Sequence, residues 1–347
     1  MNDVLRLEIT DLCNLKCKMC WSGDWKHSEM SWGHLKKLVY NFKKDGGKCI
    51  VLTSREPLLS GNFDRILKLC DFLSIELKLL SNGTLISKTV AQKIVKCNVL
   101  NYIAISLHGR EQNHDDIVGV RGAYKRALNA IKYLCYYKLL YRRKDLEIRI
   151  TSVISDVLMK DIESVISVAD MFSTDLRIQH LMWYPENIKK MHMKYLELQM
   201  KQVDNIITDF PSSCDVKYQD VCKLLEISKK LCKEKNIDLQ IYPDLNESDT
   251  FQWYNLDHYN YKNISFYCDH AMNSIRIRAN GDVAFCQYLD MNLGNVVCDD
   301  FSSLINNDEL LSYREKVQRG LLFPICYHCC HVKSVKKDSS PLDKDEI

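Results

Sequence analysis

A short strand-like run leads directly into three closely spaced cysteines at residues 4–20, which read VLRLEITDLCNLKCKMC. The run at residues 4–10 alternates apolar and polar side chains, which predicts a β-strand. Cys13, Cys17 and Cys20 follow with the spacing C-x3-C-x2-C, so one loop can wrap a compact metal centre. Three thiolates cannot fill four positions, and a four-iron cluster held here would keep one iron open to another ligand. Zinc and a chance grouping of thiols are the alternatives, although structural zinc usually takes four protein ligands.

Short β-rich runs alternate with longer amphipathic stretches in the first half of the chain. We expect strands at residues 4–10, 49–53, 75–80, 102–107, 147–154 and 175–181. We expect helices between them at residues 33–44, 63–72, 87–96, 123–136 and 161–171. Such alternation predicts an α/β fold of parallel β/α units, and six units suit an open or partly closed barrel. Ligands bind at the carboxyl ends of the strands in such folds, so the loops there should carry the chemistry.

The composition is that of an ordinary globular chain, except for its cysteines. The 347 residues are 46% apolar, and 48 basic against 45 acidic side chains give a formal net charge of +3. So small a charge gives no reason to expect binding to nucleic acid or to a membrane surface. The N-terminus lacks the basic and apolar regions of a signal peptide, and no run approaches the roughly 18 apolar residues that span a bilayer. We therefore expect a cytoplasmic protein whose 16 cysteines are free, metal-bound or catalytic rather than disulfide-bonded.

The cysteine triplet resembles the signature of radical S-adenosylmethionine (radical SAM) enzymes, in which an apolar or aromatic residue, here Met19, precedes the last cysteine. The resemblance implies a partial (β/α)6 barrel, which agrees with the six predicted units. It also implies a 4Fe–4S cluster on Cys13, Cys17 and Cys20, with SAM chelating the open iron. One electron from a flavodoxin- or ferredoxin-type donor would then cleave SAM to methionine and a 5′-deoxyadenosyl radical, which abstracts a hydrogen atom from the substrate.

Further similarities to this family follow at the ends of later predicted strands. Residues 54–57 resemble its Gly-Gly-Glu-Pro motif, with Glu56 kept and both glycines replaced by serine and arginine. The carboxylate is therefore available, whereas a close glycine-like backbone approach is not expected. The segments around Asn82 and Ser106 resemble the family's Thr-Asn-Gly and Ser-Leu-Asp-Gly segments. The resemblance implies SAM contacts from Met19, Glu56, Asn82, Ser106, Arg121 and Ser152.

A second group of cysteines lies towards the C-terminus, where short strands and turns replace the β/α pattern. Cys268 and Cys286 enclose a glycine with the spacing C-x12-G-x4-C, and Cys326 and Cys329 form a CxxC pair. Four thiolates close a tetrahedral site, for which both zinc and a 4Fe–4S cluster are eligible. The spacing resembles the twitch and SPASM appendages of radical SAM enzymes, and the lack of cysteines after Cys330 favours the shorter twitch form. The resemblance implies one auxiliary 4Fe–4S cluster that the four thiolates ligate fully.

These patterns divide the chain into four segments. We expect a radical SAM barrel at residues 1–185 and a helical connection at residues 186–262. A twitch/SPASM-like α+β domain should follow at residues 263–332, and the charged tail at residues 333–347 should be disordered.

The favoured function is that of a radical SAM oxidoreductase which oxidises a small polar substrate, similar to a sugar or aminocyclitol, and passes an electron to the auxiliary cluster. The alternative enzyme is a maturase of a ribosomally made peptide, forming a crosslink or thioether or epimerising a residue. Cys298 and Cys330 are candidate hydrogen-atom donors to a substrate radical, and the catalytic base is not assigned. A non-catalytic, metal-stabilised binding scaffold is the alternative of another class. The motifs at successive strand ends argue against it, because a scaffold has no use for a SAM pocket.

Overall fold

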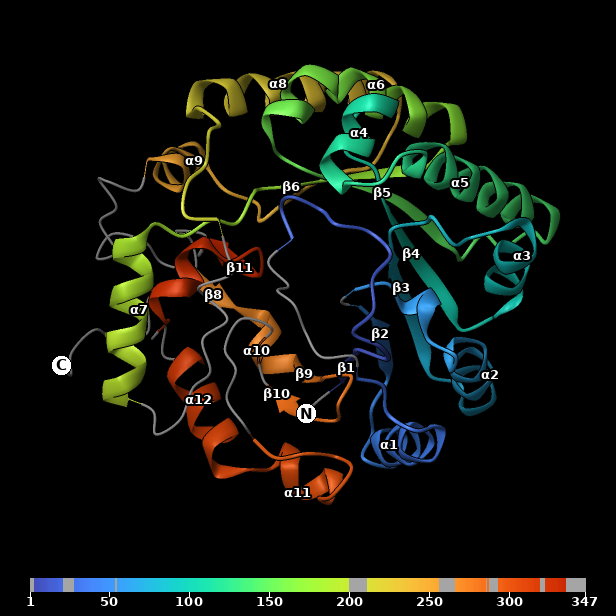
Figure 1. Ribbon diagram of the computed structural model, residues 1–347, viewed down its shortest axis with the longest axis vertical. Helices are drawn as coiled ribbons and strands as arrows, with labels where there is room; N and C mark the ends of the chain where they lie inside the picture. The colour runs from blue at the N-terminus through green and yellow to red at the C-terminus, as the bar shows by residue number, and fades with distance from the viewer. Residues whose placement is uncertain are drawn as a thin grey trace.

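The computed structural model is a mixed α/β structure built on one curved, largely parallel sheet (Figure 1). It describes residues 3–20, 28–53, 55–199, 211–255, 266–284, 286, 293–318 and 322–334. Nearly all of the predicted tail, and Ser54 of the second motif, lie outside the described residues. The strand order is β10-β9-β1-β2-β3-β4-β5-β6-β7, and within it only β10 runs antiparallel to its neighbour.

All six predicted strands are present, which confirms the predicted fold class. The strands of the large sheet are β1 (Val4–Leu7), β2 (Cys49–Leu52), β3 (Glu76–Ser81), β4 (Leu100–Ser106), β5 (Glu147–Val153), β6 (Asp175–Gln179), β7 (Leu239–Tyr242), β9 (Ser274–Ile277) and β10 (Val283–Ala284). A separate antiparallel pair joins β8 (Phe266–Cys268) to β11 (Val332–Ser334).

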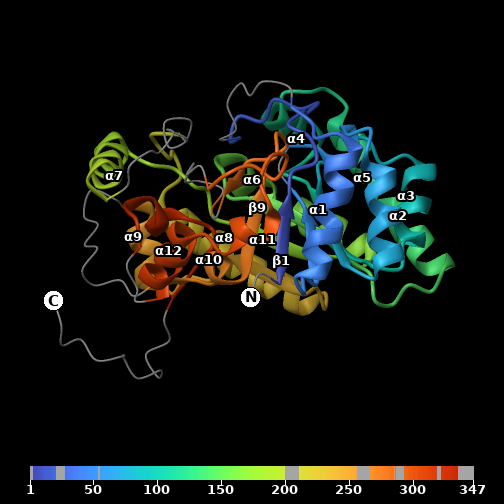
Figure 2. The ribbon, with the colours of Figure 1, turned by 90° about the horizontal axis from the view of Figure 1, so that it is seen from below.

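Helices surround the outer side of the curved sheet and fill the C-terminal region (Figures 1 and 2). The outer layer consists of α1 (Trp32–Lys44), α2 (Phe63–Leu73), α3 (Lys88–Lys96), α5 (Ala123–Leu140), α6 (Asp156–Phe172) and α8 (Tyr218–Glu234). The remaining helices are α4 (Glu111–Val118), α7 (Glu186–Gln199), α9 (Glu247–Tyr254), α10 (Asp269–Asn273), α11 (Phe301–Ile305) and α12 (Asp308–Gln318), with 3-10 turns η1 (Pro57–Leu59) and η5 (Pro324–His328). None of the described helices is long and apolar enough to cross a lipid bilayer.

The two faces of the large sheet differ in polarity. Paired residues of neighbouring strands point to the same face, and successive residues alternate. One buried row crosses the sheet on the helix-covered side as Ile277, Leu7, Leu52, Leu79, Ile103 and Ile148. The row one residue earlier points inward as Arg276, Arg6, Val51, Lys78, Tyr102 and Glu147. Apolar burial against the helices therefore holds the sheet together, and the concave face is left polar.

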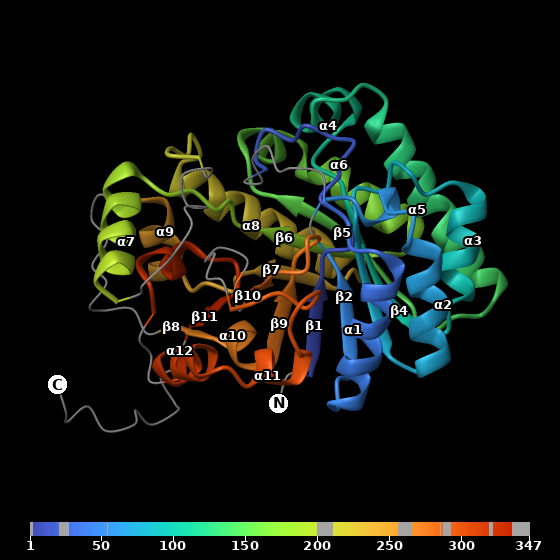
Figure 3. The same cartoon turned by 60° about the horizontal axis from the view of Figure 1, so that its bottom comes forward.

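The large sheet extends across the predicted domain boundaries. β7, from the predicted helical connection, pairs in parallel with β6. β9, from the predicted auxiliary domain, pairs in parallel with β1, with Arg6 opposite Arg276 (Figure 3). The C-terminal region is thus attached to the barrel through continuous backbone hydrogen bonding, and its first residues lie beside the strand that carries the cysteine triplet.

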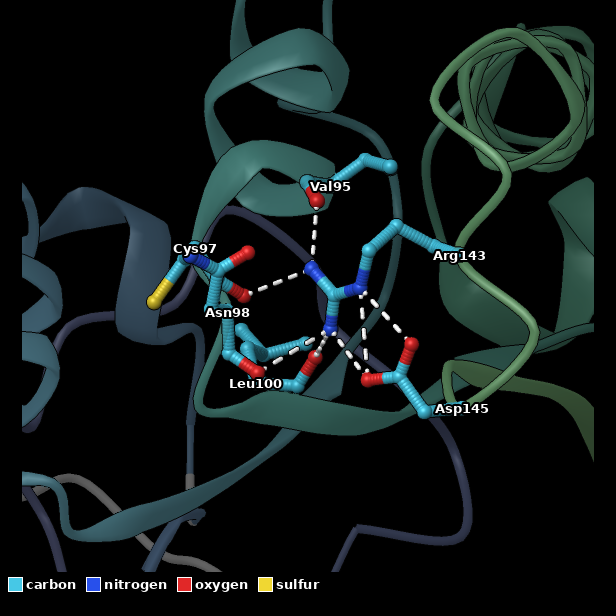
Figure 4. A network of polar contacts seen from close by, with 6 residues as sticks. All are labelled: Val95, Cys97, Asn98, Leu100, Arg143 and Asp145. Atoms are coloured by element: carbon cyan, nitrogen blue, oxygen red, sulfur yellow. Dashed lines mark hydrogen bonds and ion pairs between the residues drawn. The ribbon is translucent and has the colours of Figure 1, made fainter.

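Arg143 ties the N-terminal edge of the sheet to the end of α3 (Figure 4). Its buried guanidinium donates to four backbone carbonyls at 2.6–3.2 Å, those of Val95, Cys97, Asn98 and Leu100. It also pairs with Asp145 at 2.8 Å. Carbonyls at a helix C-terminus lack partners within the helix, and a cation there also complements the helix dipole. Arg143 therefore has a structural role far from the carboxyl ends of the strands.

Candidate functional site

The cysteine triplet lies in the loop after β1 and is fixed by α4. The backbone N–H groups of Lys16 and Lys18 donate to the carbonyls of Val118 and Ile117, both at 2.9 Å, and that of Cys20 donates to Cys17 at 3.0 Å. These bonds hold the loop against the last turn of α4, a helix that the sequence analysis did not predict. Because α4 leads into α5, the outer helical layer sets the position of the thiols.

Met19 belongs to a small apolar cluster under this loop. It packs with Leu15 and Cys17 against buried residues of the α4–α5 region, including Ile117 and Val118. Gly119, at a φ of +70°, ends α4, and a Cβ there would lie 2.9 Å from the carbonyl oxygen of Lys16. The glycine is therefore needed both for its backbone conformation and for the close approach of the cysteine loop. The predicted contact of Met19 with SAM stays a prediction, and its packing role is what the structure describes.

Glu56 is fully buried at the end of the β2 loop. Its carboxylate accepts from the Ser81 hydroxyl at 2.9 Å, from the Asn82 N–H at 2.8 Å and from the Leu58 N–H at 3.2 Å. Burial raises the pKa of this carboxyl to about 7, and the three donors lower it. Its own N–H donates to the Leu12 carbonyl at 3.0 Å, so the β2 loop is joined to the cysteine loop. Glu56 thus organises the ends of β1, β2 and β3 at once.

The replaced glycine position keeps an unusual backbone. Arg55 has a positive φ of 20°, a region that residues other than glycine seldom occupy. Burial raises the pKa of the nearby Cys13, Glu56 and Cys20 add to this effect, and the guanidinium of Arg55 opposes it in part. Arg55 therefore brings positive charge close to the first thiol of the triplet. The Gly-Gly-Glu-Pro motif that this segment resembles has a glycine at this position.

Asn82 completes the contact between the β3 loop and the cysteine loop. Its amide donates to Asn14 Oδ1 at 2.9 Å, and its carbonyl oxygen accepts from the Thr84 N–H at 2.9 Å and from the Thr84 hydroxyl. The Asn14 amide in turn donates to the Thr84 hydroxyl at 2.8 Å. Asn14 and Thr84 were not predicted, although both stand beside motif residues. The three side chains form a closed polar triangle that orients the loop carrying Cys13.

The remaining predicted SAM contacts differ in their placement. Ser106 is half-buried at the end of β4 on the concave face, opposite Thr151. Ser152 points to the apolar face, is fully buried and gives its hydroxyl to the Leu107 carbonyl. Because side chains alternate along β5, Thr151 is a better candidate for a SAM contact than Ser152. The Thr151 Oγ1 has no hydrogen-bond partner among the described residues. Arg121 is exposed in the turn between α4 and α5.

The triplet thiols are close enough to affect one another. Burial, followed by the neighbouring Cys20 and Cys13, raises the pKa of Cys17 to about 12. A thiolate at this position therefore requires compensating positive charge, which a bound metal centre supplies. Cys13 and Cys20 are exposed, and none of the three thiols is in a disulfide. Three adjacent thiols outside any disulfide, two of which have pKa values raised by burial, fit a 4Fe–4S cluster on this loop.

The second cysteine group is assembled from three separate segments. Cys268 ends β8, Cys286 follows β10, and Cys326 and Cys329 lie in and after η5. The backbone N–H of Cys329 donates to the Cys326 carbonyl at 3.1 Å, and Val332 pairs with Cys268 in the small sheet. Burial raises the pKa of Cys326 well above its usual range, and the charges of Cys268 and Cys286 add to this effect. The fold thus brings together the four thiols that the spacing predicted.

Tyr184 links the barrel to this second group. Its buried hydroxyl donates towards the carbonyls of Ile325 at 2.8 Å and His328 at 3.1 Å. Burial raises its pKa well above the usual value, and the nearby cysteines add to that effect. Tyr313 is buried on α12. Burial raises its pKa well above the usual value, and the four cysteines of the second group add to that effect. Neither tyrosine was predicted, because no sequence pattern connects residue 184 with a loop some 140 positions later.

The two candidate hydrogen donors occupy different environments. Cys330 is buried, interacts with the thiol of Cys329, and donates its N–H towards the Met182 sulfur at 3.4 Å. Cys298 is exposed in a turn, where its N–H donates to the Asn295 carbonyl at 3.1 Å. Cys330 therefore lies between the second cysteine group and the barrel, and a hydrogen-donor role stays a prediction for both.

No three His, Cys, Asp or Glu side chains of the described chain converge tightly enough to hold a single metal ion. A cubane distributes its thiolates over different irons, so it does not require such convergence. The donor sets of both groups, three thiols and four thiols, match the two predicted clusters in number and kind.

Comparison with protein families supports both halves of this description. The model of the radical SAM superfamily matches residues 7–141, which include the cysteine triplet. The SPASM model, an iron–sulfur cluster-binding domain, matches residues 268–330, which include all four cysteines of the second group. These families bind 4Fe–4S clusters and SAM, which confirms the predicted cofactors.

Curated relatives match mainly over the barrel. An AdoMet-dependent heme synthase of Nitratidesulfovibrio vulgaris is 26% identical over 181 residues, covering 51% of this chain and 46% of the relative. The sporulation killing factor maturation protein SkfB of Bacillus subtilis is 25% identical over 130 residues, covering 37% of this chain and 32% of SkfB. The chain therefore spans less than half the length of these relatives.

Solved structures match over nearly the whole chain. Streptococcus suis SuiB has a TM-score of 0.67 and 15% identity, covering 95% of this chain and 72% of SuiB. The structure of anSMEcpe with AdoMet and a peptide has a TM-score of 0.63 and 16% identity, covering 94% of this chain and 85% of anSMEcpe. These likenesses concern the fold. Together with the two family matches they lead to one conclusion: the chain belongs to the radical SAM superfamily and carries a C-terminal iron–sulfur cluster-binding domain of the SPASM type.

Proposed function

We propose that this chain is an oxidative radical SAM enzyme with one auxiliary 4Fe–4S cluster. In the proposed reaction the substrate gives one hydrogen atom to the 5′-deoxyadenosyl group, one proton to a base and one electron to the auxiliary cluster. The electron that cleaves SAM to methionine comes from an external flavodoxin- or ferredoxin-type donor. The observation that carries the proposal is the joining of the cysteine loop to the ends of β2 and β3 through Leu12–Glu56 and Asn14–Asn82.

Cys13, Cys17 and Cys20 would hold the first cluster. When bound there with SAM, it supplies reductive cleavage of the sulfonium and a primary carbon radical. The chain's own contribution is to fix the three thiols through α4 and to present polar groups at neighbouring strand ends. Glu56 is committed to three donors of the protein, so we assign it first to positioning the Asn82 backbone. A carboxylate has about four acceptor positions, which leaves capacity for an ammonium of SAM.

Cys268, Cys286, Cys326 and Cys329 would hold the auxiliary cluster. Four protein ligands leave no open iron, so the proposed role is electron acceptance rather than substrate binding. Tyr184 and Tyr313 are both buried near these cysteines, and Tyr184 fixes the CxxC backbone to the barrel. Exclusion of water and hydrogen bonding around cluster thiolates set the reduction potential of such a centre.

For the substrate, we place peptide modification ahead of the sugar- or aminocyclitol-like oxidation expected from the sequence. SkfB is named as a sporulation killing factor maturation protein, and SuiB was solved with a precursor peptide. A second candidate is a tetrapyrrole, since several relatives are named heme synthases and one an Fe-coproporphyrin III synthase. Incubation with deuterated peptide or tetrapyrrole and location of the label in 5′-deoxyadenosine decides between them.

SAM cleavage tests the proposal directly. Anaerobically reconstituted protein reduced with dithionite should convert SAM to methionine and 5′-deoxyadenosine. Cys17→Ser should abolish this product, and Cys222→Ser, at a half-buried position of α8, serves as the matched control. Loss of cleavage in the wild type with intact clusters would favour the binding scaffold instead.

Metal analysis tests the auxiliary cluster separately. Two 4Fe–4S clusters require about 8 iron atoms per chain, and Cys326→Ser combined with Cys329→Ser should reduce this to about 4. About 4 iron atoms together with one zinc in the wild type would refute the auxiliary cluster, and with it the proposed electron acceptor.

A further inference from the structure

Aromatic rings cover His328, which stands in the sequence between two of the cysteines assigned to the auxiliary cluster. His328 ends η5, directly before Cys329 and two positions after Cys326, and it is buried. The indole of Trp253 stacks on its ring at a centroid distance of 4.4 Å and an interplanar angle of 12°. The indole of Trp183 meets the same ring edge-on at 5.5 Å. Two tryptophans therefore pack on a side chain that belongs to the CxxC turn itself.

The segment after β6 fixes both partners of this stack. Trp253 lies on α9, is 1% exposed and donates its indole N–H to the Leu181 carbonyl at 2.9 Å. Nδ1 of His328 lies 2.9 Å from the Trp183 carbonyl. Leu181 and Trp183 are two and four residues beyond the end of β6. The barrel therefore sets the position of the tryptophan and of the histidine ring under it.

A second contact attaches α9 to the barrel beside this stack. The hydroxyl of Tyr254 lies 2.9 Å from Nδ1 of His180, which is fully buried. The His180 ring also lies 5.7 Å from the Trp253 ring. Breaking buried hydrogen bonds is costly, so the inner face of α9 is held against the CxxC turn.

The outer face of α9 has a different environment. Phe251 is 44% exposed, and its ring meets that of Tyr218 edge-on at 5.2 Å. Glu247 and Ser248 are exposed as well. One face of this short helix thus covers the cysteine turn, and the other faces solvent.

Burial of the CxxC turn bears on the redox chemistry of a cluster held there. Cys326 and Cys329 are both buried. Reduction of a 4Fe–4S cluster with four thiolate ligands adds a negative charge to a group that is already anionic. Water stabilises such a charge and burial disfavours it, so solvent exposure is one of the factors that set the potential. Rings that exclude water from this turn therefore lower the reduction potential.

We propose that Trp253, through its stack on His328, keeps water away from the CxxC side of the auxiliary cluster and so holds its reduction potential low. This inference rests on the proposed function, which makes that cluster the electron acceptor. It deepens the proposed function by naming the residue that regulates how readily the cluster takes up and releases the electron. Trp253 is a positioning residue, because it acts on the cluster through His328.

Potentiometric EPR titration of the anaerobically reconstituted holoenzyme tests the role of Trp253. The auxiliary cluster is the one whose signal stays unchanged when SAM is added, because it has no open iron. Trp253→Leu should raise its potential by about 59 mV or more, which is a tenfold change in the ratio of reduced to oxidised cluster. Trp253→Phe keeps one flat ring over His328 and should give a smaller positive shift.

Phe251→Leu is the matched control, since it shortens an aromatic side chain on the outer face of the same helix and should leave the potential unchanged. A wild-type potential in both Trp253 variants overturns the proposal, and so does an equal shift in Phe251→Leu. Folded Trp253 variants that fail to load the second cluster also overturn it, because the ring would then serve assembly of the cluster rather than its potential.

The failure of this inference and that of the proposed function are separable. Iron analysis and SAM cleavage of the wild type test the proposed function alone. A wild type that holds about 8 iron atoms and cleaves SAM, with no shift in the Trp253 variants, loses only the role of this tryptophan. A wild type that holds zinc at the second cysteine group or cleaves no SAM loses the proposed function whatever the variants give.

Discussion

The side-chain amide of Asn82 donates to Asn14 Oδ1 at 2.9 Å, joining the loop after β3 to the loop that carries the cysteine triplet. Thr84 closes the triangle by accepting from Asn14 at 2.8 Å. Asn14 follows Cys13 directly, so its orientation is coupled to that of the first thiol. A polar network between two loops can hold a geometry that neither loop would keep alone.

Replacing Asn14 by alanine should therefore loosen the triplet without unfolding the barrel. The variant loses two side-chain hydrogen bonds, each worth about 1 kcal/mol, and we expect a SAM affinity about tenfold lower. Titration of SAM onto reconstituted protein measures this. Asn129→Ala, at an exposed position of α5, is the control and should bind SAM normally. If the two variants bind SAM with equal affinity, the contacts among Asn14, Asn82 and Thr84 do not position the SAM site.

Gly119→Ala should displace the cysteine loop by steric contact. A Cβ at this position lies 2.9 Å from the Lys16 carbonyl, and the φ of +70° adds backbone strain. Gly46→Ala is the matched control, since it has a φ of +85° and no atom within 4 Å of its Cβ. Both variants should lose about 1 kcal/mol of unfolding free energy from strain, and Gly119→Ala alone should also lose iron from the first cluster. Iron analysis and urea unfolding of both proteins separate the two effects.

Local patterns predicted the strands well and the remote pairings poorly. The six runs that form β1 to β6 carry alternating or continuous apolar residues. Burial of their apolar faces against the helices stabilises strands with this pattern. The pairing of β9 with β1 joins residues about 270 positions apart, and no local pattern encodes a partner at that distance. The helix α4 was missed because five of its first six residues have charged or amide side chains.

Site prediction was most specific where chemistry was tied to a short motif. The spacing of both cysteine groups predicts their cluster ligation, because thiol ligands are rare and their intervals are distinctive. Ser152 was named as a SAM contact, whereas the strand's alternation turns Thr151 towards the concave face. Tyr184 had no signal, since its partners are backbone carbonyls of a distant turn. Motifs therefore identify ligands, and the groups that hold the ligands in place require the fold.

His114 should make the stability of the protein depend on pH in the acidic range. Burial lowers its pKa to about 4, against an ordinary value of 6.5, so the unfolded chain binds a proton that the folded chain rejects. The resulting contribution to stability is complete above pH 6.5 and is lost as the pH falls towards 4. Between pH 6.5 and 4, the unfolding free energy of the wild type should fall by up to about 3 kcal/mol more than that of His114→Gln. Urea unfolding at several pH values measures this difference. Parallel pH profiles for the two proteins would contradict the assignment.

Arg143→Gln should destabilise the barrel while sparing the site. The substitution removes the guanidinium that donates to four backbone carbonyls at the end of α3 and the start of β4, and we expect a loss of about 3 kcal/mol in unfolding free energy. Arg142→Gln, at the neighbouring exposed position, should change stability by less than about 0.5 kcal/mol. Folded Arg143→Gln protein should bind SAM as tightly as the wild type. A weakened SAM affinity with unchanged stability would assign Arg143 a role that its contacts do not indicate.

Tyr184→Phe tests whether the barrel positions the auxiliary cluster. The variant keeps the buried ring and removes the hydroxyl that donates to the carbonyls of Ile325 and His328, on either side of Cys326. A buried carbonyl without a donor costs about 1–3 kcal/mol, so the CxxC turn should become less ordered and bind its cluster less firmly. We expect iron to fall from about 8 towards about 4 atoms per chain during anaerobic gel filtration. SAM cleavage should continue, because the first cluster is held by α4, and Tyr136→Phe on the surface of α5 should retain all its iron. Full retention of iron in Tyr184→Phe, with an unchanged reduction potential of the auxiliary cluster, would show that the four thiolates position the cluster without this tyrosine.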